Sequence, residues 1–152
     1  MTAPIILLRD DVYGQINTDS AGYATVPTVE KTYYPLSKRE NLTTPLVSVV
    51  PLTWDKTRLL RSKAYEHELP IQVGIKKLVT DPTDTDEIDT LIELVEEVMN
   101  SCVSDFISSP EKFTWLRIEA LRDENGNILN HERMMIDNVF LCVFTSFYKG
   151  VK

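Results

Sequence analysis

Residues 84–103 read DTDEIDTLIELVEEVMNSCV, and this stretch carries the strongest structural signal in the chain. Its apolar residues recur at spacings of three and four, the pattern of a helix with one buried face. Asp84 is the predicted N-cap, and Glu87 three positions later completes the pattern of a capping box. The residues expected to face the interior are Ile88, Leu91, Ile92, Val95, Val98, Met99, Cys102 and Val103. Leu94 is the one large apolar residue off this stripe.

The opposite face of the predicted helix is acidic. Its outward acids are Asp89, Glu93, Glu96 and Glu97, and residues 81–97 hold eight acids and no Lys or Arg. Such a run is most often a solvated helix face. The alternative is a face that repels DNA or meets a basic neighbour.

A basic segment, residues 52–64, lies earlier in the chain. Its bases are Lys56, Arg58, Arg61 and Lys63, against the single acid Asp55, and Trp54 lies near its start. Residues 46–50 before it are a β-branched run. The segment 65–78 follows it, and its core, residues 71–75, alternates as a half-buried strand does. We therefore expect a long hairpin or ribbon that carries these bases.

The other elements predict an α+β fold. Apolar residues at spacings of three and four mark a helix over residues 3–17, with Thr2 as N-cap and Pro4 in its first turn. That apolar face consists of Ile5, Leu8, Val12 and Ile16. A loop is expected over residues 18–28 and a strand over residues 29–34.

Two more strands are predicted at the C-terminal end. They cover residues 113–121 and 134–148, joined by a hairpin turn at Asn125-Gly126, a pair that accepts positive φ. The last strand is apolar on both faces, which indicates a central strand or one covered by a partner. The order α-β-β-β-α-β-β predicts a mainly antiparallel β-sheet with two packed α-helices and a protruding β-hairpin. No internal repeat or linker divides it, so residues 1–152 are predicted to form a single domain.

The charge balance narrows the function. The chain has 16 Lys and Arg against 23 Asp and Glu, a net charge of −7. That balance argues against tight nucleic-acid binding, which needs a basic footprint. Residues 51–100 hold 6 bases and 11 acids, so five of the seven excess negative charges lie there. We interpret this as a polarised surface suited to head-to-tail contacts between subunits.

Neither a membrane segment nor catalytic chemistry is predicted. The apolar segment at the start of the sequence is interrupted by Arg9 and Asp10, so a signal peptide is not expected. We therefore expect the protein to be made and used in a cytoplasm. His67 and His131 have no partner at zinc-ligand spacing, and we expect no metal, cofactor or catalytic residue. The two cysteines are expected to be buried core residues.

Several segments together resemble a known family in their order and spacing. They are Ile5–Asp10, Tyr33–Leu36 followed by Leu42, Val47–Pro51, Arg61, Ile71–Lys77, Asp86–Asp89 and Phe147-Tyr148. The family is the tail-terminator (tail-completion) proteins of long-tailed bacteriophages, with the related minor tail and neck proteins. The resemblance covers most of the chain and is weakest over residues 104–135.

The resemblance implies a structural protein of the virion tail or neck. It implies a six-fold homo-oligomeric ring, assembled in the host cytoplasm, that caps the tail tube, ends its growth and meets the head connector. DNA would pass through its channel without specific binding. Ring contacts are heterologous, and we expect the basic ribbon of one subunit, with Trp54, to meet the acidic helix of the next.

Four alternatives remain open. The first is that residues 56–63 form an exposed loop whose charges only maintain solubility, and the second is that they face the channel and touch passing DNA. The third is that the chain is another neck, head-completion or tail tube protein of the same virion. The least favoured alternative is a small cytosolic ligand-binding or enzymatic domain.

Overall fold

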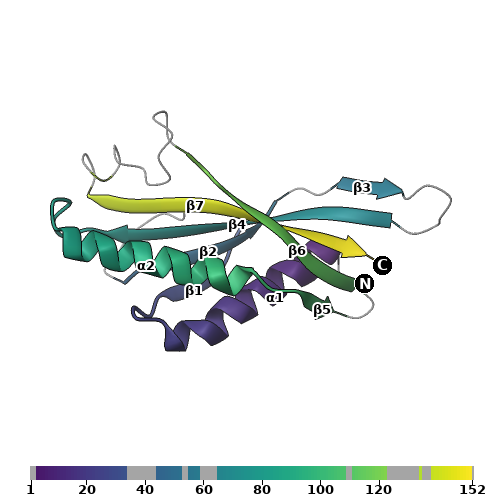
Figure 1. Cartoon of the computed structure of the whole chain (residues 1–152), viewed down its shortest axis with the longest axis horizontal. Coiled ribbons are helices and arrows are strands. Elements are labelled where there is room, and N and C mark those ends of the chain that lie inside the picture. Colours follow the sequence, from purple (N-terminus) through teal and green to yellow (C-terminus); the bar gives the residue numbers. More distant parts are fainter. Residues whose placement is uncertain are drawn as a thin grey trace.

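The computed structural model of the chain describes residues 3–33, 44–52, 55–58, 65–108, 111–122, 134 and 138–151. Two helices lie on one face of a twisted sheet (Figure 1). The elements are α1 (Pro4–Asp19), a short 3-10 turn (Ser20–Gly22), β1 (Thr28–Lys31), β2 (Leu46–Pro51), β3 (Asp55–Arg58), β4 (Tyr65–Leu78), α2 (Thr85–Cys102), β5 (Phe106–Ser108), β6 (Glu111–Ala120) and β7 (Val139–Val151). The predicted α+β class is confirmed.

The sheet is built around its two longest strands. Its order is β1-β2-β4-β7-β6-β5, with β3 also paired to β4. Strands β4 and β7 pair without a break from Glu66↔Val151 to Leu78↔Val139. Every pairing is antiparallel except that of β1 with β2. The mainly antiparallel sheet is therefore as predicted, and β5 is a strand that the sequence did not reveal.

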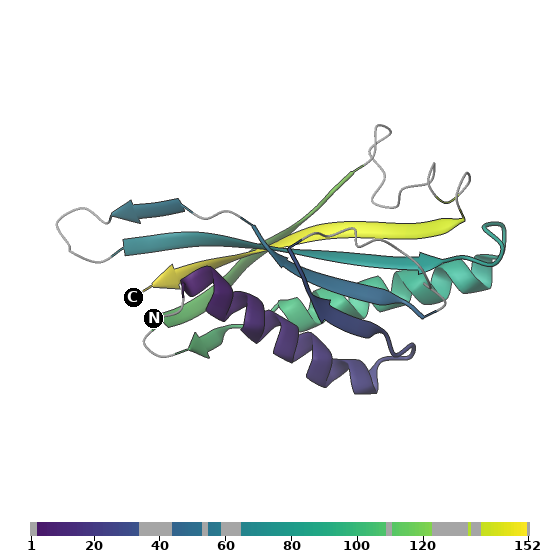
Figure 2. The same ribbon diagram turned by 180° about the vertical axis from the view of Figure 1, so that it is seen from behind.

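The predicted ribbon is also present. Strand β2 pairs with the second half of β4, and β3 then pairs with its first half, from Asp55↔Glu68 to Arg58↔Tyr65. This hairpin protrudes beyond the helices, at the end of the molecule where both termini lie (Figures 1 and 2). Residues 59–64 lie outside the described residues.

Helix α1 buries the predicted face. Ile5, Leu8, Val12 and Ile16 are all at most 2% exposed. Pro4 is its first residue, where the missing N–H costs no hydrogen bond. The N-cap is Ala3, which makes no side-chain cap, so the assignment of the cap to Thr2 was wrong. The helix runs two residues further than expected, to Asp19.

The buried face of α2 is rotated from the prediction. Leu94 is 1% exposed and lies in the core, whereas Ile92 and Val103 are 42% and 46% exposed. The core stripe consists of Leu91, Leu94, Val95, Val98 and Cys102. Placing Ile92 and Val103 inside was wrong because α2 packs against both α1 and β7, and this fixes the buried arc around Leu94.

The N-cap of α2 is as predicted, but the capping box is not closed. The Asp84 carboxylate accepts a hydrogen bond from the backbone N–H of Asp86. Glu87 does not return to Asp84. Its carboxylate accepts hydrogen bonds from the Thr80 N–H at 3.1 Å and the Lys77 ammonium at 3.0 Å. Glu87 thus fastens the β4–α2 connection.

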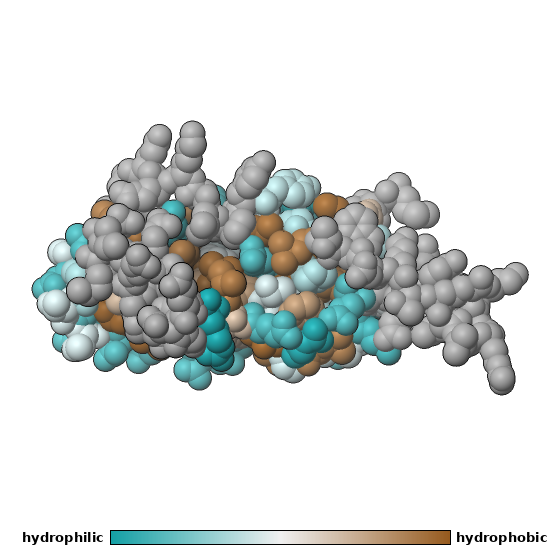
Figure 3. Space-filling model, turned by 90° about the horizontal axis from the view of Figure 1, so that it is seen from above, coloured by the Kyte–Doolittle hydropathy of each residue, from teal (hydrophilic) through white to brown (hydrophobic). Residues whose placement is uncertain are grey.

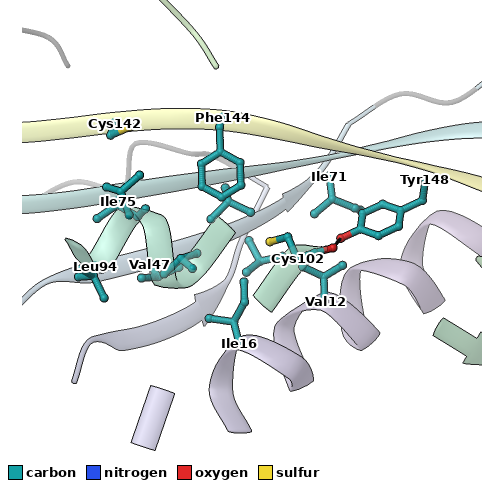
Figure 4. Packing of buried hydrophobic residues seen from close by; sticks show 14 of the residues in the cluster. Val12, Ile16, Val47, Ile71, Ile75, Leu94, Cys102, Cys142, Phe144 and Tyr148 are labelled. Carbon is teal, nitrogen blue, oxygen red and sulfur yellow. Dashed lines mark hydrogen bonds between the residues drawn. The ribbon is translucent and has the colours of Figure 1, made fainter. Parts of the chain in front are cut away.

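The core between helices and sheet centres on β7. Cys142, Phe144 and Tyr148 point from β7 toward the helices (Figure 4), and Phe140 of the same strand belongs to the same core. The Tyr148 hydroxyl, 0% exposed, donates a 2.5 Å hydrogen bond to the carbonyl oxygen of Cys102, at the end of α2. Cys102 and Cys142 are buried free thiols, as predicted.

The other face of β7 is buried too. Val139, Leu141 and Val143 are at most 8% exposed and pack with Leu78. Because β7 lies between β4 and β6, its two apolar faces fit the predicted central strand. On the face seen from above, the described residues mix hydrophobic and hydrophilic side chains (Figure 3). The strand begins at Val139, five residues later than expected, and Asn125-Gly126 lies outside the described residues.

The substitution Tyr148→Phe is expected to lower the free energy of unfolding by about 0.5–1.5 kcal/mol, because it removes a buried hydrogen bond to the Cys102 carbonyl, which keeps the one that it accepts from the Ser104 N–H. Urea denaturation measures this as a lower midpoint. Tyr33→Phe is the matched control, since Tyr33 is 62% exposed and its midpoint should not move. Equal midpoints for both variants would contradict the assignment.

Candidate assembly interface

Three of the four predicted acids form an exposed stripe along α2. Asp89, Glu93 and Glu96 are spaced by four and three residues, so they lie on one face of the helix. All three are exposed, and none pairs with a base in the described part of the chain. Ile92 is exposed one turn from Asp89 and Glu96. The stripe therefore combines unpaired negative charge with an apolar side chain.

The fourth acid, Glu97, has a structural role. It is half-buried, and its carboxylate accepts a hydrogen bond from the backbone N–H of Ala24 at 3.3 Å. The adjacent Tyr23 hydroxyl is hydrogen-bonded to Ser101. Burial raises the pKa of Tyr23 to about 12. Glu97 and Ser101 thus hold the loop after α1 against α2, so Glu97 is less available to a neighbour than the other three acids.

The structure places two of the predicted bases and leaves the others undescribed. Lys56 and Arg58 lie in β3, opposite His67 and Tyr65 of β4. Trp54, Arg61 and Lys63 lie outside the described residues. Strand β3 lies at one end of the molecule, and α2 begins at the other (Figure 1). The fold therefore separates the basic strand from the N-terminal part of the acidic helix.

A second charged cluster, which the sequence did not reveal, lies at the base of the ribbon. The Arg117 guanidinium of β6 pairs with Glu68 of β4 at 2.7 Å and with Glu119 at 3.1 Å. The central carbon (Cζ) of this guanidinium lies 4.1 Å from the ring centroid of Phe147 in β7. The hydrogen bonds that Arg117 donates to Glu68, and then to Glu119, raise the pKa of Arg117. These contacts tie three strands together on the sheet face away from the helices.

Only the register could have revealed this cluster. Arg117 lies opposite Phe147, and a register shift between Trp115 and Arg117 sets that pairing. Such an irregularity increases the local twist of a sheet. The alternation of Arg117 and Glu119 in the sequence shows that they share a face, but it does not reveal what lies across the strand.

The described residues provide neither a metal-binding cluster nor a membrane-spanning helix. Within the part of the chain that the structure describes, no group of three or more His, Cys, Asp and Glu could hold a metal ion. Among those residues, no helix is both long and apolar enough to cross a membrane. The side chain of His67 and all of His131 lie outside the description.

The two thiols are held in the protonated form. Burial raises the pKa of Cys102 to about 12 and that of Cys142 to about 11. The thiolate is the reactive form of cysteine. At neutral pH these residues therefore serve as packing groups.

Both thiols should resist a thiol reagent such as Ellman's reagent at pH 8 in the folded protein and react in urea. Because their folded pKa values lie above the unfolded value of 9.0, the folded chain binds more protons between pH 9 and about 12. Their contribution to stability is therefore present below pH 9 and falls as the pH rises through that range. Rapid reaction of either thiol in the native protein would contradict the described burial.

Comparison with known proteins shows a likeness of fold but none of sequence. No protein-family model matches the sequence, and no curated protein matches it significantly. Among solved structures, the chain is similar to a chain in the "Virion of native gene transfer agent (GTA) particle", with a TM-score of 0.50 and 14% identity. The match covers 99% of this chain and 98% of the other. At this identity the likeness shows a shared fold over the full length of both chains.

Proposed function

We propose that the chain is a structural protein of a phage-like virion. The observation that supports this most is the shared fold, from end to end, with a chain of a gene transfer agent virion. The family resemblance of the sequence points to the same kind of particle, although it rests on different observations. Fold alone does not fix function, so the specific role below is argued from this chain's own surface.

Within the virion, we propose that the chain forms a ring that caps the tail tube, ends its growth and joins the tail to the head connector. A ring of identical subunits needs two different complementary surfaces on each subunit. In this chain the bases Lys56 and Arg58 belong to β3 and the acidic stripe to α2, and these two elements lie at separate places on the molecule. That separation lets each surface meet the other on a neighbouring copy.

The acidic partner surface has features of an interface. Asp89, Glu93 and Glu96 make no ion pair that a neighbour would have to break, within the described residues. The exposed Ile92 beside them supplies apolar area, and apolar residues surrounded by charge are typical of contact surfaces. On the other side, Arg58, Arg61 and Trp54 are residue types enriched at interface hot spots.

A ring at this position surrounds the path of the viral DNA. The net charge of −7 suits a conduit through which DNA slides and does not suit a protein that grips it. If Lys and Arg side chains of the segment 56–63 face the channel, their contacts with DNA phosphates are weak and easily screened by salt.

The main alternative is another neck or head-completion protein, or a tail tube protein, of the same virion. A tube subunit must stack on other copies of itself without limit, whereas a terminator ring must not accept a further ring on top of it. An enzymatic or ligand-binding role is less favoured, because it would require a pocket lined by convergent polar groups.

Reversing two ribbon charges should abolish the ring. In the variant Arg58→Glu/Arg61→Glu, the ribbon carries the same sign as the acidic stripe, so native mass spectrometry is expected to show monomers where the parent shows rings. Lys31→Glu is the control, because its 3.5 Å pair with Asp10 is exposed and contributes little. Normal rings in the double variant would contradict the ribbon–helix contact.

A charge swap separates loss of the contact from loss of the fold. Glu93→Lys/Glu96→Lys alone should also prevent assembly, because both side chains are exposed and their replacement leaves the core intact. Combining it with Arg58→Glu/Arg61→Glu in one chain should restore rings. Failure of the combined variant, with each variant folded by circular dichroism, would show that these charges do not face each other.

DNA binding is expected to be weak and to disappear with moderate salt. A filter-binding titration of duplex DNA should show retention only at low ionic strength, because any contact is between DNA phosphates and a few Lys and Arg side chains. Nanomolar binding that resists salt would contradict the conduit and favour a DNA-binding role.

A further inference from the structure

At the ribbon end of the sheet, two strands have an edge that no other strand pairs within the described residues. Strand β2 ends at Pro51, and β3 takes its place beside β4, so at this end the strands lie in the order β3-β4-β7-β6-β5. Among the described residues, no strand pairs with the outer side of β3 or of β5. An unpaired edge presents backbone N–H and C=O groups that can accept another strand.

The two edges run in the same direction. Each of the four pairings from β3 to β5 is antiparallel, so the direction reverses four times and β5 runs parallel to β3. A rotation about an axis along the strands preserves their direction. It therefore places β3 of one copy beside β5 of the next as a parallel pair.

The two edges are also level along the strands. Thr57 pairs with Glu66, Glu66 with Val151, Val151 with Lys112, and Lys112 with Ile107. Thr57 and Ile107 thus occupy the two ends of one row across the sheet. Joining copies at this row needs no shift of register between the two strands, and such a heterologous contact forms a ring when the rotation between copies closes.

The β5 edge carries an apolar side chain that its own chain leaves uncovered. Ile107 is 75% exposed, the most exposed of the large hydrophobic residues described. Natural edge strands are usually protected by charge or by covering elements. Val103, at the end of α2 and four residues before Ile107, is also exposed, at 46%.

Charge alone does not select this pairing. In the level arrangement, Asp55 of one copy occupies the row of Asp105 of the next, and Asp105 already accepts a hydrogen bond from the Trp115 N–H at 2.9 Å. Lys56 and Arg58 occupy the rows of Phe106 and Ser108. The neighbour that supplies β5 also contributes the acids of α2, the helix that leads into β5.

From these edges we infer that β5 of each subunit accepts β3 of a second copy as a parallel strand, so that the sheets join around the ring. The inference rests on the proposed ring but goes beyond it, because it names the backbone pairing and its register. The ribbon then contributes a strand to the contact in addition to its charges.

Disulfide trapping tests the register directly. The variant Thr57→Cys/Ile107→Cys places two thiols in adjacent strands of neighbouring copies, at a spacing that a disulfide can bridge. After oxidation, a non-reducing gel is expected to show a ladder from dimer to complete ring. Thr57→Cys/Leu121→Cys is the matched control, because Leu121 is 64% exposed but lies outside β5, and it should give no ladder. The native cysteines are buried and should not contribute.

A second variant tests the apolar edge without added thiols. Ile107→Lys is expected to shift the native mass spectrum from rings to monomers, whereas Leu121→Lys should leave rings intact. If rings form in the parent but the cysteine pair gives no ladder and Ile107→Lys still assembles, the edge pairing is wrong and the proposed ring stands. If the parent forms no ring at all, the proposed function and the edge pairing both fail.

Discussion

The pairing of β4 with β7 is the constraint on which the other elements depend. It runs unbroken from Glu66↔Val151 to Leu78↔Val139, and β7 is buried on both faces over its first half. Strands β2 and β3 attach to the free side of β4, and β6 and then β5 attach to the free side of β7. Strand β7 pairs with β4 almost as far as Tyr65, the first residue of β4. The ribbon formed by β3 and β4 is therefore supported by a third strand along much of its length. That support gives a protruding hairpin a defined direction.

The same central strand also positions the helix that carries the acidic stripe. Tyr148 of β7 donates its hydroxyl to the carbonyl of Cys102, where α2 ends, and Phe106 of β5 packs near the Tyr148 ring with centroids 5.8 Å apart. The end of α2 and the start of β5 are therefore held to one buried side chain. Strand β7 therefore fixes the positions of both surfaces proposed for assembly, the α2 stripe and the β5 edge. It also fixes the position of the ribbon, through its pairing with β4.

Periodicity in the sequence was sufficient to locate the helices and the long strands. Ile5, Leu8, Val12 and Ile16 repeat at helical spacing and are all buried, because α1 packs on the sheet with one face. The buried face of α2 could not be fixed in the same way. Whether Ile92 or Leu94 lies inside depends on the angle between α2, α1 and β7, which no local pattern contains. Strand β5 is three residues long, too short to show alternation.

The candidate site divides in the same manner. The acids of α2 were predictable as a surface because they lie opposite an apolar stripe, but the bond from Ala24 to Glu97 depends on a loop distant in sequence. The Arg117 cluster and the level of Thr57 with Ile107 both depend on strand register, which only the paired structure defines.

The central claim is that this chain assembles into a ring at the end of a phage-like tail. Negative-stain electron microscopy of the purified protein, alone and mixed with tail tubes, tests it most directly. The account predicts rings with an open channel in the first sample and a ring seated at one end of each tube in the second. Particles of single-chain size in the first sample, and tubes with bare ends in the second, would contradict it.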